Sequence, residues 1–415
     1  AAAATAAAAS AALASTAPLA AAEPLPRLRQ MVGVRLEDIE LLAVARFLSF
    51  TEVANIVLAS HEAAEVLTLV RRVSKTVGTS FMTGRQLMVP VVEVRRESAC
   101  MLRRASVGHI EVLRLWSRIA FDEFVIILQE EGVHSFSSLQ RFSAKGCDID
   151  ESDLDALAPL IGCSQLLSLV NFEKNKLRDG LVANSLVGAL TTSLFDTLNL
   201  RFNMVSDDTA AAVAELLGKP HETLSVVNFK VNRITDAGAT ELASSLPRNN
   251  VLRVLNLRRQ HPGLTDVAAK SLAAALREND SLIRLLLRGN RISDEGCGAL
   301  ADTVTSRFLR LSASLASASR CSSFELDLED NQVNIPGGLA VLKCLQAVGP
   351  KADMEMLFHG NKWLDRDALR SALLEVGADP CAADDQRLRL ESSKAEHLVR
   401  VEDREKFLAP VHRDI

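Results

Sequence analysis

A repeat of 28 to 30 residues runs through the middle of the sequence. Its clearest copy is the stretch from Leu282 to Ser293, which reads LIRLLLRGNRIS. The asparagine of this pattern can be followed along the chain at 28 to 30 residue spacings, with one gap of 41. The marker positions are Cys147, Asn175, Asn203, Asn232, Gln260, Asn290, Asn331 and Asn361. Because self-similarity at a fixed period is typical of solenoids, this repeat limits the fold more than any other feature.

Each copy is expected to contain one strand and one helix. Apolar residues alternate before the marker, which indicates a short strand. After it come pairs such as Thr235-Asp236 and Thr265-Asp266, where a capping oxygen and a first-turn acid favour a helix start. One such unit cannot bury its apolar face alone. Stacked units therefore predict a curved α/β solenoid with a parallel inner sheet and outer helices.

These units resemble leucine-rich repeats of the ribonuclease-inhibitor type over residues 137–380, about eight units in all. The resemblance implies that the repeated asparagine bonds the backbone of the turn after each strand. The residues given this structural role are Asn175, Asn203, Asn232, Asn290, Asn331 and Asn361. The sequence departs from the pattern in two places, at Gln260, which replaces asparagine, and at an insertion over 306–323.

Segments outside the repeats are less regular. Residues 1–26 are an Ala-rich low-complexity stretch, either a tail or a transit peptide. Residues 27–136 are expected to form a mainly helical N-terminal domain. Within it, 31–75 resembles a degenerate F-box, with Phe47-Leu-Ser-Phe50 as the turn between two helices. The F-box resemblance implies docking to a ubiquitin-ligase adaptor; the alternative is a plain cap for the open end of the solenoid. Residues 381–415 are a charged C-terminal cap or tail.

Two segments before the repeats carry strand signals. Residues 108–120 resemble a worn ninth repeat at the start of the solenoid. Residues 87–94 are rich in valine and contain Pro90, which cannot donate a ladder hydrogen bond and therefore indicates an edge strand.

Composition and motifs argue against catalysis. The chain has no G-x-S-x-G, H-E-x-x-H or phosphate-loop motif, and its eight histidines are dispersed. No catalytic residue, metal site or cofactor is predicted, and the protein is expected not to be an enzyme. A net charge of −5 does not favour a nucleic-acid partner. The seven scattered cysteines favour a reducing, cytoplasmic location, with organelle import left open, and no apolar run is long enough for a membrane span.

The candidate binding surface is the inner face of the sheet. Side chains alternate along a strand, so the residues between the core leucines point into the concave groove. Three sets are expected there. The basic set is Arg201, Lys230, Arg258 and Arg288; the amide set is Asn171, Asn199, Asn228 and Asn256; the acidic set is Glu325, Asp327 and Glu329.

The basic set suggests an anionic partner. Neighbouring strands lie about 4.8 Å apart. Like charges at that distance repel by about 1 kcal/mol per pair even in water, and a bound anion would relieve that cost. We therefore predict a protein-interaction scaffold that binds an acidic peptide or protein segment, with a basic element of it near the acidic set. The alternatives are a hydrated face with self-neutralising charges, an F-box-type substrate-recognition subunit of a ubiquitin ligase, and a structural subunit of a large assembly.

Overall fold

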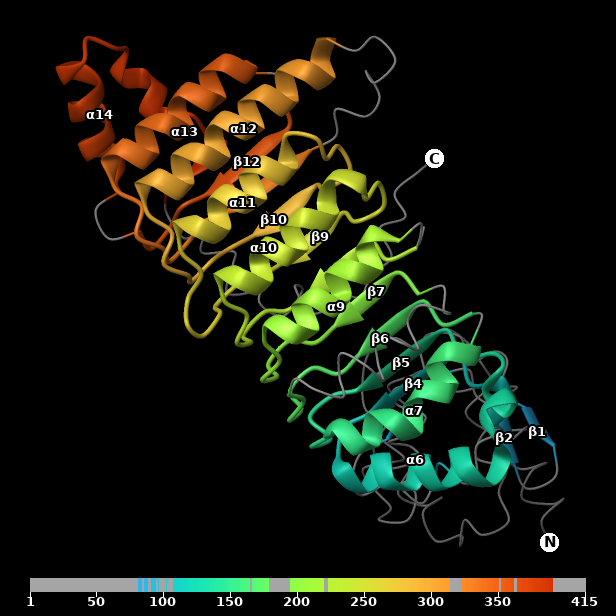
Figure 1. Cartoon of the computed structure of the whole chain (residues 1–415). Helices are drawn as coiled ribbons and strands as arrows, with labels where there is room; N and C mark the ends of the chain where they lie inside the picture. The colour runs from blue at the N-terminus through green and yellow to red at the C-terminus, as the bar shows by residue number, and fades with distance from the viewer. Residues whose placement is uncertain are drawn as a thin grey trace, which may run out of the picture.

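One sheet of eleven parallel strands, in chain order from β3 to β13, dominates the computed structural model (Figure 1). Its strands are β3 Val91–Val94, β4 Val112–Leu115, β5 Arg141–Ala144, β6 Leu169–Asn171, β7 Thr197–Asn199, β8 Val226–Asn228, β9 Val254–Asn256, β10 Arg284–Leu286, β11 Phe324–Asp327, β12 Met354–Leu357 and β13 Leu388–Arg389. A separate antiparallel pair consists of β1 Phe81–Thr83 and β2 Gln86–Met88. The structure describes residues 81–83, 86–88, 91–94, 96, 102, 107–164, 166–178, 195–219, 223–313, 323–350, 352–361 and 364–390.

Helices alternate with these strands. They are α6 Arg118–Glu131, α7 Glu151–Cys163, α9 Asp207–Gly218, α10 Asp236–Ser245, α11 Asp266–Leu276, α12 Asp294–Ala313, α13 Ile335–Val348 and α14 Arg366–Glu375. Four short 3-10 helices, η4 Val107–His109, η5 Val133–Phe136, η7 Leu246–Arg248 and η9 Pro380–Asp384, complete the described helical elements. Helices α9 to α13 lie side by side along one face of the sheet (Figure 1). The fold is therefore the leucine-rich-repeat solenoid that the strand–helix pattern predicted.

The sheet extends beyond residues 137–380 on both sides. Strands β3 and β4 precede this range, and β13 follows it. The segment 108–120 contains β4, while the segment 87–94 contains β3 at the edge of the sheet. The described part of 27–136 thus contributes strands to the same sheet. The F-box-like segment 31–75, with the adaptor contact it implies, lies outside the described residues.

The insertion at 306–323 lengthens a helix. Helix α12 has 20 residues, whereas its neighbours α10 and α11 have 10 and 11. Arg307 in the added turns donates from Nη2 to the backbone oxygen of Leu282 at 2.7 Å, which fastens the longer helix to the repeat before β10. Residues 314–322 of the insertion lie outside the described residues.

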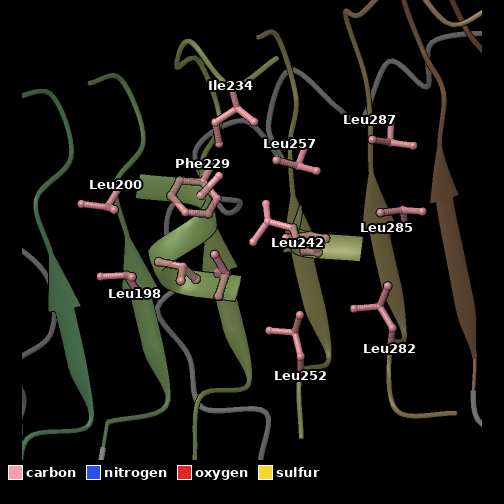
Figure 2. Close-up of a cluster of buried hydrophobic side chains, with 14 of the residues drawn as sticks. Leu198, Leu200, Phe229, Ile234, Leu242, Leu252, Leu257, Leu282, Leu285 and Leu287 are labelled. Atoms are coloured by element: carbon pink, nitrogen blue, oxygen red, sulfur yellow. The ribbon is translucent and has the colours of Figure 1, made fainter. Parts of the chain in front are cut away.

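The core lies between the sheet and the helices. Alternate residues of each strand point inward, so the same position of successive strands forms a continuous apolar row. Figure 2 shows one such row, Leu200, Phe229, Leu257 and Leu287, all fully buried. Leu242 of α10 is also fully buried and lies beside these strands in Figure 2. Since neighbouring repeats share every row, no repeat holds a core of its own.

The marker asparagines bond the backbone of two repeats at once. Asn232 donates from Nδ2 to the backbone oxygens of Leu200 and Phe229, both at 2.9 Å. Its Oδ1 accepts the backbone N–H of Val205 at 3.3 Å. Gln260 makes the equivalent contacts with its longer side chain, donating to Phe229 and accepting from Ile234. A glutamine at this position therefore preserves the turn.

Aspartates at the helix starts form a second tie between repeats. Oδ1 and Oδ2 of Asp207 accept the backbone N–H and the hydroxyl of Thr235 at 2.8 and 2.6 Å. The same arrangement joins Asp236 to Thr265. From the sequence these acids were expected only to complement the helix dipole. The structure adds a bridge to the next repeat.

Candidate functional site

The strand register brings the predicted basic set together. Asn199, Asn228 and Asn256 are direct partners across β7, β8 and β9. Arg201, Lys230 and Arg258 each follow two residues later and therefore stand at matching strand ends. Arg288 occupies the same place after β10, where Leu286 pairs with Asn256. The four bases form a row across the concave face.

The amide set serves the backbone. Asn171, Asn199, Asn228 and Asn256 are at most 5% exposed. Each Oδ1 accepts the N–H of the residue two places on, at 3.0 to 3.1 Å. These asparagines hold the strand ends that carry the bases, and their oxygens are already engaged. The Nδ2 amide of Asn256 is buried with no hydrogen-bond partner among the described residues.

The acidic set lies on β11 and just after it, and it pairs with arginines of this chain. Arg258 donates from Nε to Asp327 at 2.5 Å, and Arg284 donates from Nε to Glu325 at 2.6 Å. Further pairs join Arg288 to Glu329 and Asp330, and Arg259 to Asp330. We call these eight residues the Arg–acid network: Arg258, Arg259, Arg284, Arg288, Glu325, Asp327, Glu329 and Asp330. The four positive and four negative charges of the network cancel. This is the arrangement that the alternative of a hydrated face with self-neutralising charges predicted for this part of the sheet.

Gly289, which follows β10, leaves room for the side chain of Arg259 in the network. Arg258 and Arg259 follow β9 and reach past β10 to carboxylates on and after β11. Gly289 lies between, with a φ of +70° that favours glycine. A Cβ on Gly289 would meet Cγ of Arg259 at 2.6 Å, closer than real contacts allow. Glycine at position 289 therefore allows the side chain of Arg259 to reach across to Asp330 in this conformation.

The Arg258–Asp327 pair is the most buried part of the network. Asp327 is fully buried and Arg258 is 9% exposed. Burial raises the pKa of Asp327, and the charge of Arg258 opposes that rise. The pair is therefore held in a site where neither charge is stable without the other.

Lys230 has a different environment. It is half-buried, and no carboxylate of the described residues lies within ion-pairing distance of it. Burial lowers the pKa of Lys230 to about 7, and Arg201, Arg258, Arg259 and Arg288 lower it further by repulsion. Beside Lys230, Arg201 stacks on the ring of Phe202 at 4.6 Å. Repulsion from four arginines thus converges on Lys230.

Apolar residues and an ion pair lie on either side of Lys230. Val226, Val254 and Leu286 form a small buried cluster separate from the main core. On the other side, Lys145 pairs with Glu173 at 2.9 Å. The concave face therefore has an ion pair at Lys145 and Glu173, an uncompensated base at Lys230, and the balanced Arg–acid network beyond it.

Across the described ranges, no group of three histidine, cysteine, aspartate or glutamate side chains is arranged to hold a metal ion. Nor does any helix in those ranges have the length and apolar character needed to cross a membrane.

Comparison with known proteins supports the repeat class. No protein-family model matches the chain. The chain is 24% identical over 270 residues to mouse NACHT, LRR and PYD domains-containing protein 4C, covering 65% of this chain and 26% of that protein. It is 25% identical over 264 residues to pig ribonuclease inhibitor, covering 59% of this chain and 57% of the inhibitor. The chain thus spans about a quarter of the first relative and just over half of the second. These relatives confirm the resemblance to leucine-rich repeats of the ribonuclease-inhibitor type.

Two solved structures are also similar to the chain. The complex of Rad7 and Elc1 from yeast gives a TM-score of 0.40 at 13% identity, covering 84% of this chain and 85% of that one. The plant peptide hormone receptor RGFR1, solved with RGF2, gives a TM-score of 0.29 at 17% identity, covering 63% and 45%.

Proposed function

We propose that this protein is a non-enzymatic binding scaffold that captures an acidic protein or peptide segment on its concave face, centred on Arg201 and Lys230. One of its relatives, pig ribonuclease inhibitor, is by its name a protein that acts on another protein. The repeat architecture supports the same general use here, because a solenoid offers one extended concave surface for contact.

The observation that carries the proposal is the environment of Lys230. Four arginines repel it, and none of the carboxylates that the structure describes pairs with it. A partner carboxylate would relieve this repulsion, so an anion is the ligand that the site favours. Glu325, Asp327 and Glu329 already pair with arginines in the Arg–acid network, so no basic element of the partner is expected to bind them.

A charge reversal with a matched control tests this function. The probe is a glutamate-rich peptide, and the measurement is isothermal titration at low and at physiological salt. Arg201→Glu with Lys230→Glu should weaken binding by at least tenfold, because attraction is replaced by repulsion. Arg233→Glu with Arg291→Glu makes the same change in net charge at two exposed turn positions and should leave binding unchanged. Equal losses in the two double variants, or tighter binding of a lysine-rich peptide, would contradict the proposal.

A further inference from the structure

Resting on this proposed function, we propose that Lys230 binds one carboxylate of the acidic partner directly and takes up a proton as it does so. The groove would then hold its partner in mildly acidic solution and release it in mildly alkaline solution. Lys230 would thus contact one carboxylate of the partner, and capture of the partner would depend on pH.

The position of Lys230 supports direct contact with a single carboxylate. The Lys230 backbone N–H donates to Oδ1 of Asn228 at 3.1 Å, which fixes the end of β8. Arg201 faces it from the end of β7, and Arg258 faces it from the end of β9. Neighbouring strands are about 4.8 Å apart, so the three cationic side chains share one small area of the sheet.

The arginines around Lys230 differ from it in being paired with acids. Arg258, Arg259 and Arg288 repel Lys230, and each of the three is also paired with an acid after or on β11. Their guanidinium groups are therefore already bonded, whereas Lys230 has no acidic partner within the described ranges. A ligand carboxylate reaching this area consequently finds its free cation at Lys230.

An unsatisfied neutral donor lies on the strand next to Lys230. The Nδ2 amide of Asn256 is buried without an acceptor among the residues described. Because Asn256 is fully buried, the half-buried Lys230 is the donor of the two that a partner carboxylate meets.

Proton uptake follows from the repulsion on Lys230. In the free protein its pKa lies at about 7, because burial and the surrounding arginines disfavour the ammonium. A bound carboxylate favours the ammonium and raises the pKa again. Below pH 7 the lysine is already charged and the affinity is constant. Above pH 7 each binding event must supply a proton, so the affinity falls by about tenfold per pH unit.

The test compares Lys230 with an arginine at the same position. Titrations of a glutamate-rich peptide are made at pH 6 and pH 8, each in two buffers of different ionisation heat, to count the protons taken up. The wild-type affinity should fall by about tenfold between the two pH values, with close to one proton taken up at pH 8. Lys230→Arg keeps the charge but does not titrate, so its affinity should be the same at both. Lys230→Met should bind weakly at both.

The outcomes separate this inference from the function on which it rests. If Lys230→Arg shows the same tenfold fall as the wild type, another group titrates and the inference is overturned, while the acidic-segment function stands. If the peptide binds none of the proteins at either pH, the proposed function fails and the inference fails with it.

Discussion

The ends of β7 and β8 and the ends of β9 to β11 occupy equivalent places on the concave face, yet they treat charge in opposite ways. Beyond β9, arginines and carboxylates neutralise one another in the Arg–acid network, two of the arginines reaching across β10. At β8, Lys230 stands beside arginines with no described carboxylate to pair with. The difference indicates that the network contributes to folding stability, whereas Lys230 costs stability and is available for binding.

The largest expected effect comes from breaking the buried pair of the network. Asp327→Ala leaves the Arg258 guanidinium buried without its counter-charge, which should lower the free energy of unfolding by about 3–5 kcal/mol. Urea denaturation followed by circular dichroism measures the change. Asp330→Asn is the control in the same network, because asparagine tolerates the positive φ of 52° at this position. Its carboxylate is 34% exposed, so its loss should cost about 1 kcal/mol or less. Equal losses in the two variants would show that burial of the pair does not matter.

The second prediction has the opposite sign and concerns Lys230. Lys230→Met removes the repulsion with its strand neighbours and should stabilise the fold by about 2 kcal/mol at neutral pH. The folded-state pKa of about 7 is below the ordinary value of 10.5, so the unfolded chain binds more protons between these values. Wild-type stability should therefore fall as the pH drops from 10.5 to 7, and this slope should be absent in Lys230→Met. Denaturation midpoints across this pH range provide the measurement, and parallel curves for the two proteins would refute the prediction.

A smaller effect is expected where the network crosses β10. Gly289→Ala places a Cβ against Arg259 in a left-handed backbone conformation, and should cost about 1–2 kcal/mol. Gly298→Ala in α12 is the control, because a Cβ there meets nothing within 4 Å. Alanine favours a helix over glycine, so the control should be neutral or slightly stabilising. Thermal unfolding of both variants would detect the contrast, and its absence would remove the steric argument for Gly289.

The repeat period made much of this fold predictable from sequence. An alternating strand and a capped helix recur at almost constant spacing, so β5 to β12 follow from local pattern alone. The sheet edges were harder to predict, because β3, β4 and β13 lack the marker asparagine, and β13 has only two residues. Their place in the sheet depends on pairing with a neighbouring strand.

The chemistry of the groove was predictable only in part. Alternation placed the three candidate sets on one face, but it does not state which charges bond to each other. Arg258 follows β9 and Asp327 lies on β11, 69 residues further along the chain and on the other side of β10. Their contact depends on a side chain that reaches across an intervening strand. Arg259 and Asp330 were missed as a pair for the same reason, although the glycine after β10 was visible in the sequence.

The most direct test of the account measures affinity and stability together in Lys230→Met and Arg288→Met. Both substitutions remove one positive charge from the same row of the concave face. At pH 6 we expect Lys230→Met to lose affinity for a glutamate-rich peptide and to unfold at higher urea than the wild type. Arg288→Met should instead unfold at lower urea, because Glu329 and Asp330 each lose their ion pair with Arg288, and should keep most of its affinity. Equal changes of affinity and of stability in the two variants would contradict the division of the groove into a binding part and a stabilising part.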